Sequence, residues 1–219
     1  MNTTNKLSFI FLLLIFFASF ANKSLFAQEQ INVRPISSSE LPAGINYEGS
    51  IKEAFSFSDA MGENIVITSE TGVYKSKKFK HENDGSDAEL FAYHFTVDGN
   101  KVVQVWRVYD LIKDCPLDIE VNFLKNTLQV TDLNNDGVAE IWLMYKTVCH
   151  GDVSPADMKI IMYEGQKKFA MRGQNKVKLS ENEFIGGDYK FDNAFNSAPD
   201  PFRTFALDLW NKNIMQKWE

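Results

Sequence analysis

The sequence predicts a mainly β, antiparallel, single domain that is closed by one C-terminal α-helix. Apolar and polar residues alternate through the middle of the chain, which is the pattern of strands with a buried face. Turn residues such as Asp98-Gly99 separate these runs. After residue 200 the apolar residues recur at spacings of three and four, which is the period of a helix.

The N-terminal segment predicts an exported protein. Lys6 precedes an uncharged apolar stretch at residues 7–21, and Ala27 offers a cleavage point. This order is typical of a secretory signal peptide, which we expect over residues 1–27. The alternative is a membrane anchor, but the stretch is short against the roughly 20 residues that a span needs. We therefore expect a protein of the periplasm, the cell surface or the extracellular space, with no membrane span after cleavage.

The charge of the chain argues against some partners. The 219 residues carry a formal net charge of −6, and removal of the signal peptide, with Lys6 and Lys23, would make it −8. A basic run remains at residues 75–80, where we expect a solvated strand edge. This acidic balance argues against nucleic acid and anionic lipid as partners, and we expect neither. The mature length suits one domain.

The strands are expected in order after an exposed lead-in at residues 28–50, within a β-rich domain at residues 51–219. Two short strands should flank a turn at residues 70–72. A hairpin follows, with strands at residues 91–97 and 102–109; apolar residues on both faces predict cover on both sides. Further strands are expected near residues 119–123, 127–131, 139–146, 158–163 and 168–172.

A helix is expected at about residues 200–217. Its apolar face would be formed by Phe202, Phe205, Ala206, Leu209 and Trp210. Asp200 suits the N-cap and Pro201 the first helical position.

Cys115 and Cys149 are the two cysteines of the chain. In an exported protein two cysteines most simply form one disulfide. Closing a loop of about 34 residues would stabilise the fold by roughly 3.5–4 kcal/mol. The alternative is a pair of free thiols in a reactive or metal site, which would need a third soft ligand, and only His150 is adjacent.

The stretch "DLNNDGVAE" carries oxygen donors at alternate positions around a glycine. The expected metal ligands are Asp132, Asn134, Asp136, the main-chain carbonyl of Val138, and Glu140. Calcium takes about six to eight oxygen ligands, and a short loop can supply them when alternate side chains point inward. Gly137 permits the sharp turn that this requires. The sequence therefore predicts calcium as a cofactor.

This loop differs from an EF-hand. Leu143 stands where an EF-hand needs a bidentate glutamate, and the flanking residues have the pattern of strands. The loop resembles the calcium loops of integrin-type (FG-GAP) repeats, whose pattern D-x-[DN]-x-[DN]-G-x-x-[DE] it matches once. The resemblance implies a structural calcium site. The alternative is a polar β-turn without metal, because Asn-Asp-Gly is common in hairpins.

A wider resemblance covers most of residues 50–210. The matching segments are residues 51–72, 92–95, 113–123, 131–165 and 169–173. They resemble a family of small exported Bacteroidetes proteins that are labelled surface polysaccharide biosynthesis proteins. The resemblance implies a cell-envelope context, with surface glycans or envelope proteins as partners. The family also pairs the cysteine of "DCPLD" with that of "CHGDVSP", in agreement with the expected disulfide.

Few residues suggest catalysis. The three histidines lack ligand spacing, so we do not expect zinc. If the disulfide forms, Asp114, Asp118, His150 and Asp152 would gather beside it. Such a group could perform acid–base work of the kind that glycoside hydrolysis requires. The alternative is that these residues solvate the rim of a disulfide-tied loop.

Trp106 and Trp142 could form a sugar-binding platform, although aromatic residues in strands usually belong to the core. Together these observations predict an exported, non-catalytic cell-envelope protein with a structural calcium loop. The alternatives are an enzyme acting on glycans through the Asp/His cluster, and a carbohydrate-binding module that uses exposed tryptophans. The sequence specifies no oligomeric state.

Overall fold

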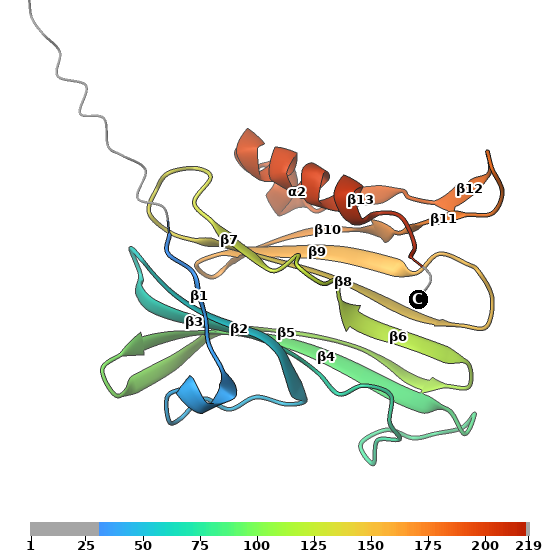
Figure 1. Cartoon of the computed structure of the whole chain (residues 1–219), viewed down its shortest axis with the longest axis horizontal. Helices are drawn as coiled ribbons and strands as arrows, with labels where there is room; N and C mark the ends of the chain where they lie inside the picture. The colour runs from blue at the N-terminus through green and yellow to red at the C-terminus, as the bar shows by residue number, and fades with distance from the viewer. Residues whose placement is uncertain (1–30, 218–219) are drawn as a thin grey trace, which may run out of the picture.

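The computed structural model describes residues 31–217, so the signal peptide predicted at residues 1–27 lies outside the described residues. The chain forms two antiparallel sheets that pack face to face, and a C-terminal helix covers the outer face of the second sheet (Figure 1). This arrangement confirms the predicted mainly β fold with one long C-terminal helix. Within the described residues no helix is long and apolar enough to cross a membrane.

The first sheet is built from the N-terminal half of the chain in the order β1-β2-β3-β4-β5. Its strands are β1 Arg34–Pro35, β2 Ser50–Asp59, β3 Gly62–Glu70, β4 Ser86–Asp98 and β5 Lys101–Cys115. The predicted hairpin is confirmed as β4 and β5. Gly99, with φ 55°, makes the turn between them.

The second sheet has the order β13-β10-β9-β8-β6, with β7 paired to β8 as well. Its strands are β6 Asp118–Phe123, β7 Gln129–Thr131, β8 Glu140–His150, β9 Asp157–Glu164, β10 Lys167–Gln174 and β13 Tyr189–Phe191. The short strands β6 and β7 pair with opposite ends of β8. A small separate sheet joins β11 Lys176–Lys178 to β12 Phe184–Gly186.

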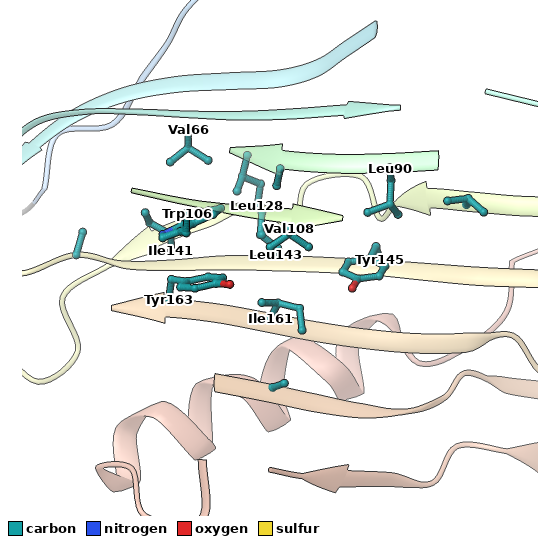
Figure 2. Packing of buried hydrophobic residues seen from close by; sticks show 14 of the residues in the cluster. Val66, Leu90, Trp106, Val108, Leu128, Ile141, Leu143, Tyr145, Ile161 and Tyr163 are labelled. Carbon is teal, nitrogen blue, oxygen red and sulfur yellow. The ribbon is translucent and has the colours of Figure 1, made fainter. Parts of the chain in front are cut away.

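The main core lies between the two sheets. Val66, Leu90 and Val108 from the first sheet and residues such as Leu143 from β8 belong to one buried cluster (Figure 2). Within it the ring of Trp106 stacks on that of Tyr163 with centroids 4.4 Å apart. Burial of this shared apolar face is what holds the two sheets together.

The C-terminal helix α2 spans Asp200–Asn213 and follows a single-turn helix, α1, at Asn193–Asn196. The predicted apolar face is confirmed, because Phe202 and Trp210 are fully buried against the second sheet. The helix ends four residues before the predicted end. Beyond it, Ile214 and Gln216 form main-chain hydrogen bonds with Lys176 of β11, which draws the chain out of the helix.

The start of α2 also differs from the prediction. Pro199 occupies the N-cap position, and Asp200 is the first helical residue. Asp200 does not cap the helix but forms an ion pair with Arg203 one turn later. A carboxylate in the first turn still interacts favourably with the helix dipole.

Residues 31–50, predicted as an exposed lead-in, are mostly exposed but begin the fold. β1 pairs with the middle of β2 at the edge of the first sheet. Ile36, Leu41 and Ile45 pack against the outer face of that sheet. This segment therefore covers apolar side chains such as Phe91 and Tyr93 that the second sheet does not reach.

Two strand predictions are wrong. The second short strand, expected after residue 72, is instead a loop at residues 71–85, and its one β-bridge pairs Tyr74 with Asp87. The basic run at residues 75–80 therefore lies in a loop and not at a strand edge. Side-chain carboxylates, not a strand ladder, hold this loop: Asp87 accepts a hydrogen bond from the Ser76 main chain at 2.7 Å. β5 is also not covered on both faces, because Tyr109, which pairs with Phe91 on the outer face of the first sheet, is 42% exposed.

Candidate functional site

The predicted disulfide between Cys115 and Cys149 is present, with the two Cα atoms 5.9 Å apart. Cys115 ends β5 of the first sheet, and Cys149 lies near the end of β8 in the second. The alternative of two free thiols is thereby excluded. The bond ties the two sheets together at one end of the sandwich.

The acid–base cluster predicted beside this disulfide does not converge. Asp114 is turned towards the loop at residues 82–85, where its carboxylate accepts main-chain hydrogen bonds from Glu82 and Gly85 at 2.8 and 2.9 Å. Although desolvation raises the pKa of Asp114, hydrogen bonds from main-chain N–H groups, led by that of Asn83, bring it below its ordinary value. Asp114 therefore organises a loop.

The remaining members stay close but lack the geometry of a catalytic group. Asp118 lies opposite His150 in the strand pairing of β6 and β8. Asp152 accepts a hydrogen bond from the Ser154 hydroxyl at 2.5 Å, and this bond holds the pKa of Asp152 below its ordinary value. Both Ser154 and Asp152 face the same nitrogen of His150, Nδ1, at 3.1 and 3.7 Å. A catalytic relay through a histidine needs one partner on each ring nitrogen, and a carboxyl that acts as general acid needs a raised pKa. His150 and Asp152 meet neither requirement.

The tryptophans cannot form a sugar platform. Trp106 is 6% exposed and Trp142 is fully buried. Trp106 belongs to the core between the sheets, and Trp142 packs under α2 beside Phe205, with ring centroids 4.6 Å apart. Both tryptophans thus lie in the core, as aromatic residues in strands usually do, and the alternative of a binding module built on them is excluded.

The predicted calcium loop, residues 132–140, is closed by its own hydrogen bonds. Both Asp132 and Asn134 direct an oxygen to the main-chain N–H of Asp136, at 3.1 and 3.2 Å. The Gly137 N–H donates to Asp132 at 3.1 Å, and Gly137 has the positive φ, 83°, that the sequence predicted for this turn. Asp136 in turn accepts from the Val138 main chain at 2.8 Å.

Glu140, the last residue of the loop, holds the start of the loop through its side chain. It is fully buried and accepts hydrogen bonds from the Thr131 hydroxyl at 2.6 Å and from the Leu133 main chain at 2.9 Å. Desolvation raises the pKa of Glu140 above its ordinary value. Across residues 31–217, no three His, Cys, Asp or Glu side chains are grouped so that they could hold a metal ion. Calcium binding at residues 132–140 thus stays a prediction from the sequence pattern.

The loop also connects the two sheets. Its main chain bonds to the turn between β2 and β3, because Ala60 donates to the Gly137 carbonyl at 2.7 Å and Ala139 donates to the Asp59 carboxylate at 2.9 Å. Asn134 donates to Glu164, at the end of β9, at 2.7 Å. The loop lies directly before β8, and the disulfide joins the other end of β8 to β5. β8 is therefore fixed to the first sheet at both ends.

Sequence reasoning missed a hollow of the surface, a groove of 670 Å³ beside the C-terminal tail. One wall comes from the first sheet, through Lys52 of β2 and Glu70 at the end of β3. The rest of the lining comes from β6, β8 and the C-terminal residues Asn213, Met215, Gln216 and Lys217. The buried side chains of Met158 and Asn175 also line it. We call this hollow the tail groove.

Hydrogen bonds fix the polar side chains of the tail groove. Lys146 lies 2.5 Å from the Glu120 carboxylate and donates to the Gln216 side-chain oxygen at 3.2 Å. The same oxygen accepts from the Asn175 amide at 2.5 Å, and Asn175 accepts from the Ala156 main chain at 2.8 Å. Glu70, from the first sheet, accepts from the main-chain N–H of Phe123 in β6 at 2.7 Å, so the two parts of the lining are joined there. These bonds hold the side chains of Lys146, Gln216, Asn175 and Glu70 in place.

No local pattern in the sequence pointed to the tail groove. Its residues come from distant segments, and the tail reaches it only because residues 214–216 bond to β11. Comparisons with protein-family models, with curated proteins and with solved structures found no match to this chain.

Proposed function

We propose that the protein is an exported, non-catalytic cell-envelope protein that binds glycan in the tail groove. The observation that carries the proposal is the groove itself, 670 Å³ in volume and lined by amide and charged side chains. Ligand pockets in proteins have volumes of roughly 300–1,000 Å³. A mono- or disaccharide unit of a longer chain fits this range.

The lining groups suit hydroxyl-rich ligands. Amides from Asn122, Asn175, Asn213 and Gln216 line the groove. Asn122 is exposed, whereas Asn175 is buried and bonded to Gln216 and Ala156 within the wall. An amide both donates and accepts hydrogen bonds, as a sugar hydroxyl does, so the two pair in either direction. Phe123 and Met215 supply apolar surface for the C–H face of a sugar ring. Side chains that are already fixed lose little entropy on binding.

The carboxylates of the groove support a binding role and not hydrolysis. Glu120 faces Lys146, and Glu70 lies 3.3 Å from Lys52. Glycoside hydrolysis needs two carboxyl groups that flank one bond, with one of them protonated. Here each carboxylate is paired with a lysine of its own wall.

The loop at residues 132–140 has a structural part in this proposal. It lies at the end of the sandwich where the turns of both sheets meet, and it holds those turns through Ala60, Ala139 and Asn134. Calcium held by Asp132, Asn134 and Asp136 would neutralise the acids of the loop and stiffen this connection. It would take no part in binding glycan.

The test is direct binding of neutral and acidic oligosaccharides to the purified exported protein by calorimetry. Asn122→Ala removes an exposed amide of the groove and should weaken binding by about 2- to 10-fold, the worth of one hydrogen bond. Asn100→Ala, in the exposed turn between β4 and β5, is the matched control and should change nothing. The oligosaccharides should also remain uncleaved on long incubation. Failure of the wild type to bind any of them, or cleavage of one, would contradict the proposal.

A further inference from the structure

We infer that the tail groove recognises the acetamido group of N-acetylated sugars, and that the side chain of Gln216 occupies the same position in the free protein; this inference rests on the proposed function. Two donors converge there on one carbonyl oxygen. Lys146 Nζ lies 3.2 Å from Oε1 of Gln216, and the amide nitrogen of Asn175 lies 2.5 Å from it. The side-chain amide of Gln216 and an acetamido group both present a C=O bonded to N–H, so an N-acetylated sugar offers these donors the same acceptor.

Both donors are held by the protein independently of Gln216. Asn175 is 2% exposed, and its side-chain oxygen accepts from the Ala156 main chain at 2.8 Å. That bond sets the orientation of the Asn175 amide, because it leaves the nitrogen to face Gln216. Lys146 is anchored by the Glu120 carboxylate at 2.5 Å. A carbonyl oxygen that replaces that of Gln216 therefore gains both hydrogen bonds without rearrangement of the donors.

The strand register places groups of the right kind beside the two donors. In the pairing of β6, β8 and β9, Asn122, Lys146 and Met158 form one row across the second sheet. All three side chains line the groove. Met158 is fully buried and gives apolar surface for the methyl of an acetamido group. Asn122 is exposed and offers its amide to a neighbouring ring hydroxyl.

The same donors do not suit a carboxylate. The charge of Lys146 is already balanced by Glu120 within the wall. An acidic ligand would bring a second carboxylate beside that of Glu120, and like charges repel at this distance. A neutral carbonyl avoids this repulsion, as that of Gln216 does. The site therefore favours N-acetylated sugars over uronic acids.

Gln216 is a competitor that the ligand must displace. It lies in the tail after α2, where the tail bonds to the main chain of Lys176 through the Ile214 carbonyl at 2.7 Å and the Gln216 N–H at 2.8 Å. Its neighbours Met215 and Lys217 are exposed, so movement of this end of the tail uncovers little apolar surface. The measured affinity is reduced according to the fraction of molecules in which Gln216 fills the site.

The experiment compares two probes on the full exported protein by calorimetry. They are the trimer of N-acetylglucosamine and the trimer of glucose with the same linkage, which differ at the acetamido group of each ring. The acetamido trimer should bind at least about fivefold more tightly, because its carbonyl accepts from the charged Lys146 as well as from Asn175.

The first variant removes the competitor. Gln216→Ala should raise the affinity for the acetamido trimer by about 3- to 10-fold and leave that for the glucose trimer within about twofold. If Gln216 served only to hold the wall, its loss would weaken both trimers alike. The matched control is Gln166→Ala, the same change in the exposed turn between β9 and β10, and it should alter neither affinity.

The second variant removes a donor. Lys146→Met keeps the length of the side chain and should bring the affinities for the two trimers to within about twofold of each other. Unchanged melting temperatures show that the variants are folded. If Lys146→Met does not fold, the wild type and Gln216→Ala still decide.

The outcomes separate the two claims. Equal binding of the two trimers by the wild type, or an affinity for the acetamido trimer that does not rise in Gln216→Ala, overturns the inference and leaves the proposed function standing. If neither trimer binds while another oligosaccharide does, the inference alone fails. If no oligosaccharide binds, the proposed function fails with it.

Discussion

His94 should make the protein less stable as the pH falls. It lies on β4, 2% exposed, between the rings of Phe57 and Trp106 in the interior of the sandwich. Its Nε2 lies 2.8 Å from the side-chain oxygen of Asn64. Burial lowers its pKa from 6.5 to about 4, because the charged imidazolium would lose its water, and the nearby Asp59 offsets only part of this effect.

The sign follows from proton linkage. Between the two pKa values the unfolded chain binds a proton at this histidine and the folded chain does not, so stability present above pH 6.5 is lost as the pH falls towards 4. Linkage with these two pKa values gives a loss of about 2 kcal/mol at pH 5. The full loss, reached below the folded pKa, is about 3 kcal/mol.

The assay is urea unfolding of the wild type and of His94→Gln at about pH 7.5 and pH 5, with the disulfide intact. Glutamine does not titrate, and His81 and His150 remain in both proteins, so the difference between them isolates His94. We expect the stability of the wild type relative to the variant to fall by about 2 kcal/mol over this range. A difference that does not change with pH would refute the argument that His94 is buried in its neutral form.

Three further predictions concern the bonds that hold the fold. Replacing Cys115 and Cys149 together by serine should lower the unfolding free energy by about 3.5–4 kcal/mol, since they close a loop with a separation of 34 residues. Two alkylatable thiols in natively exported protein would contradict the bond. Phe202→Ala should cost about 3–5 kcal/mol, or roughly 6–20 °C in melting temperature, because its ring is fully buried. The same change at Phe184, which is 40% exposed, should have little effect. Millimolar calcium should raise the melting temperature of the wild type but not that of Asp132→Ala. Identical melting curves in calcium and in chelator would show that the loop binds no metal.

The sequence predicted those features whose signal is local. The hairpin of β4 and β5 could be predicted because Asp98-Gly99 joins two runs in which apolar and polar residues alternate. The apolar face of α2 was legible because its period differs from that of a strand. The disulfide followed from the number of cysteines and the compartment expected from the N-terminal segment.

Features that depend on distant segments could not be predicted. Trp142 was expected in the core, but the sequence could not tell which element covers it, and the structure shows that α2 does. The loop at residues 71–85 has strand-forming residues, but the carboxylates of Asp87 and Glu89 draw it out of the sheet, through bonds to Ser76 and Tyr74. The tail groove has no local signal at all, because its two walls belong to different sheets.

Because the residues that line the groove come from both sheets, the bonds that join the sheets also affect the groove. Lys52 and Glu70 stand on the first sheet, and Lys146 stands on β8 of the second. The shape of the groove therefore depends on the bonds that join the second sheet to the first, among them the hydrogen bond from Phe123 of β6 to Glu70. At the start of β8 the sheets are joined by the loop at residues 132–140, through its bonds to the turn after β2, and at the end of β8 by the disulfide to β5. The disulfide holds the end of β8 to the first sheet, and the loop joins the two sheets at the far end of β2 and β3 from Lys52 and Glu70, so together they fix the second sheet along its length.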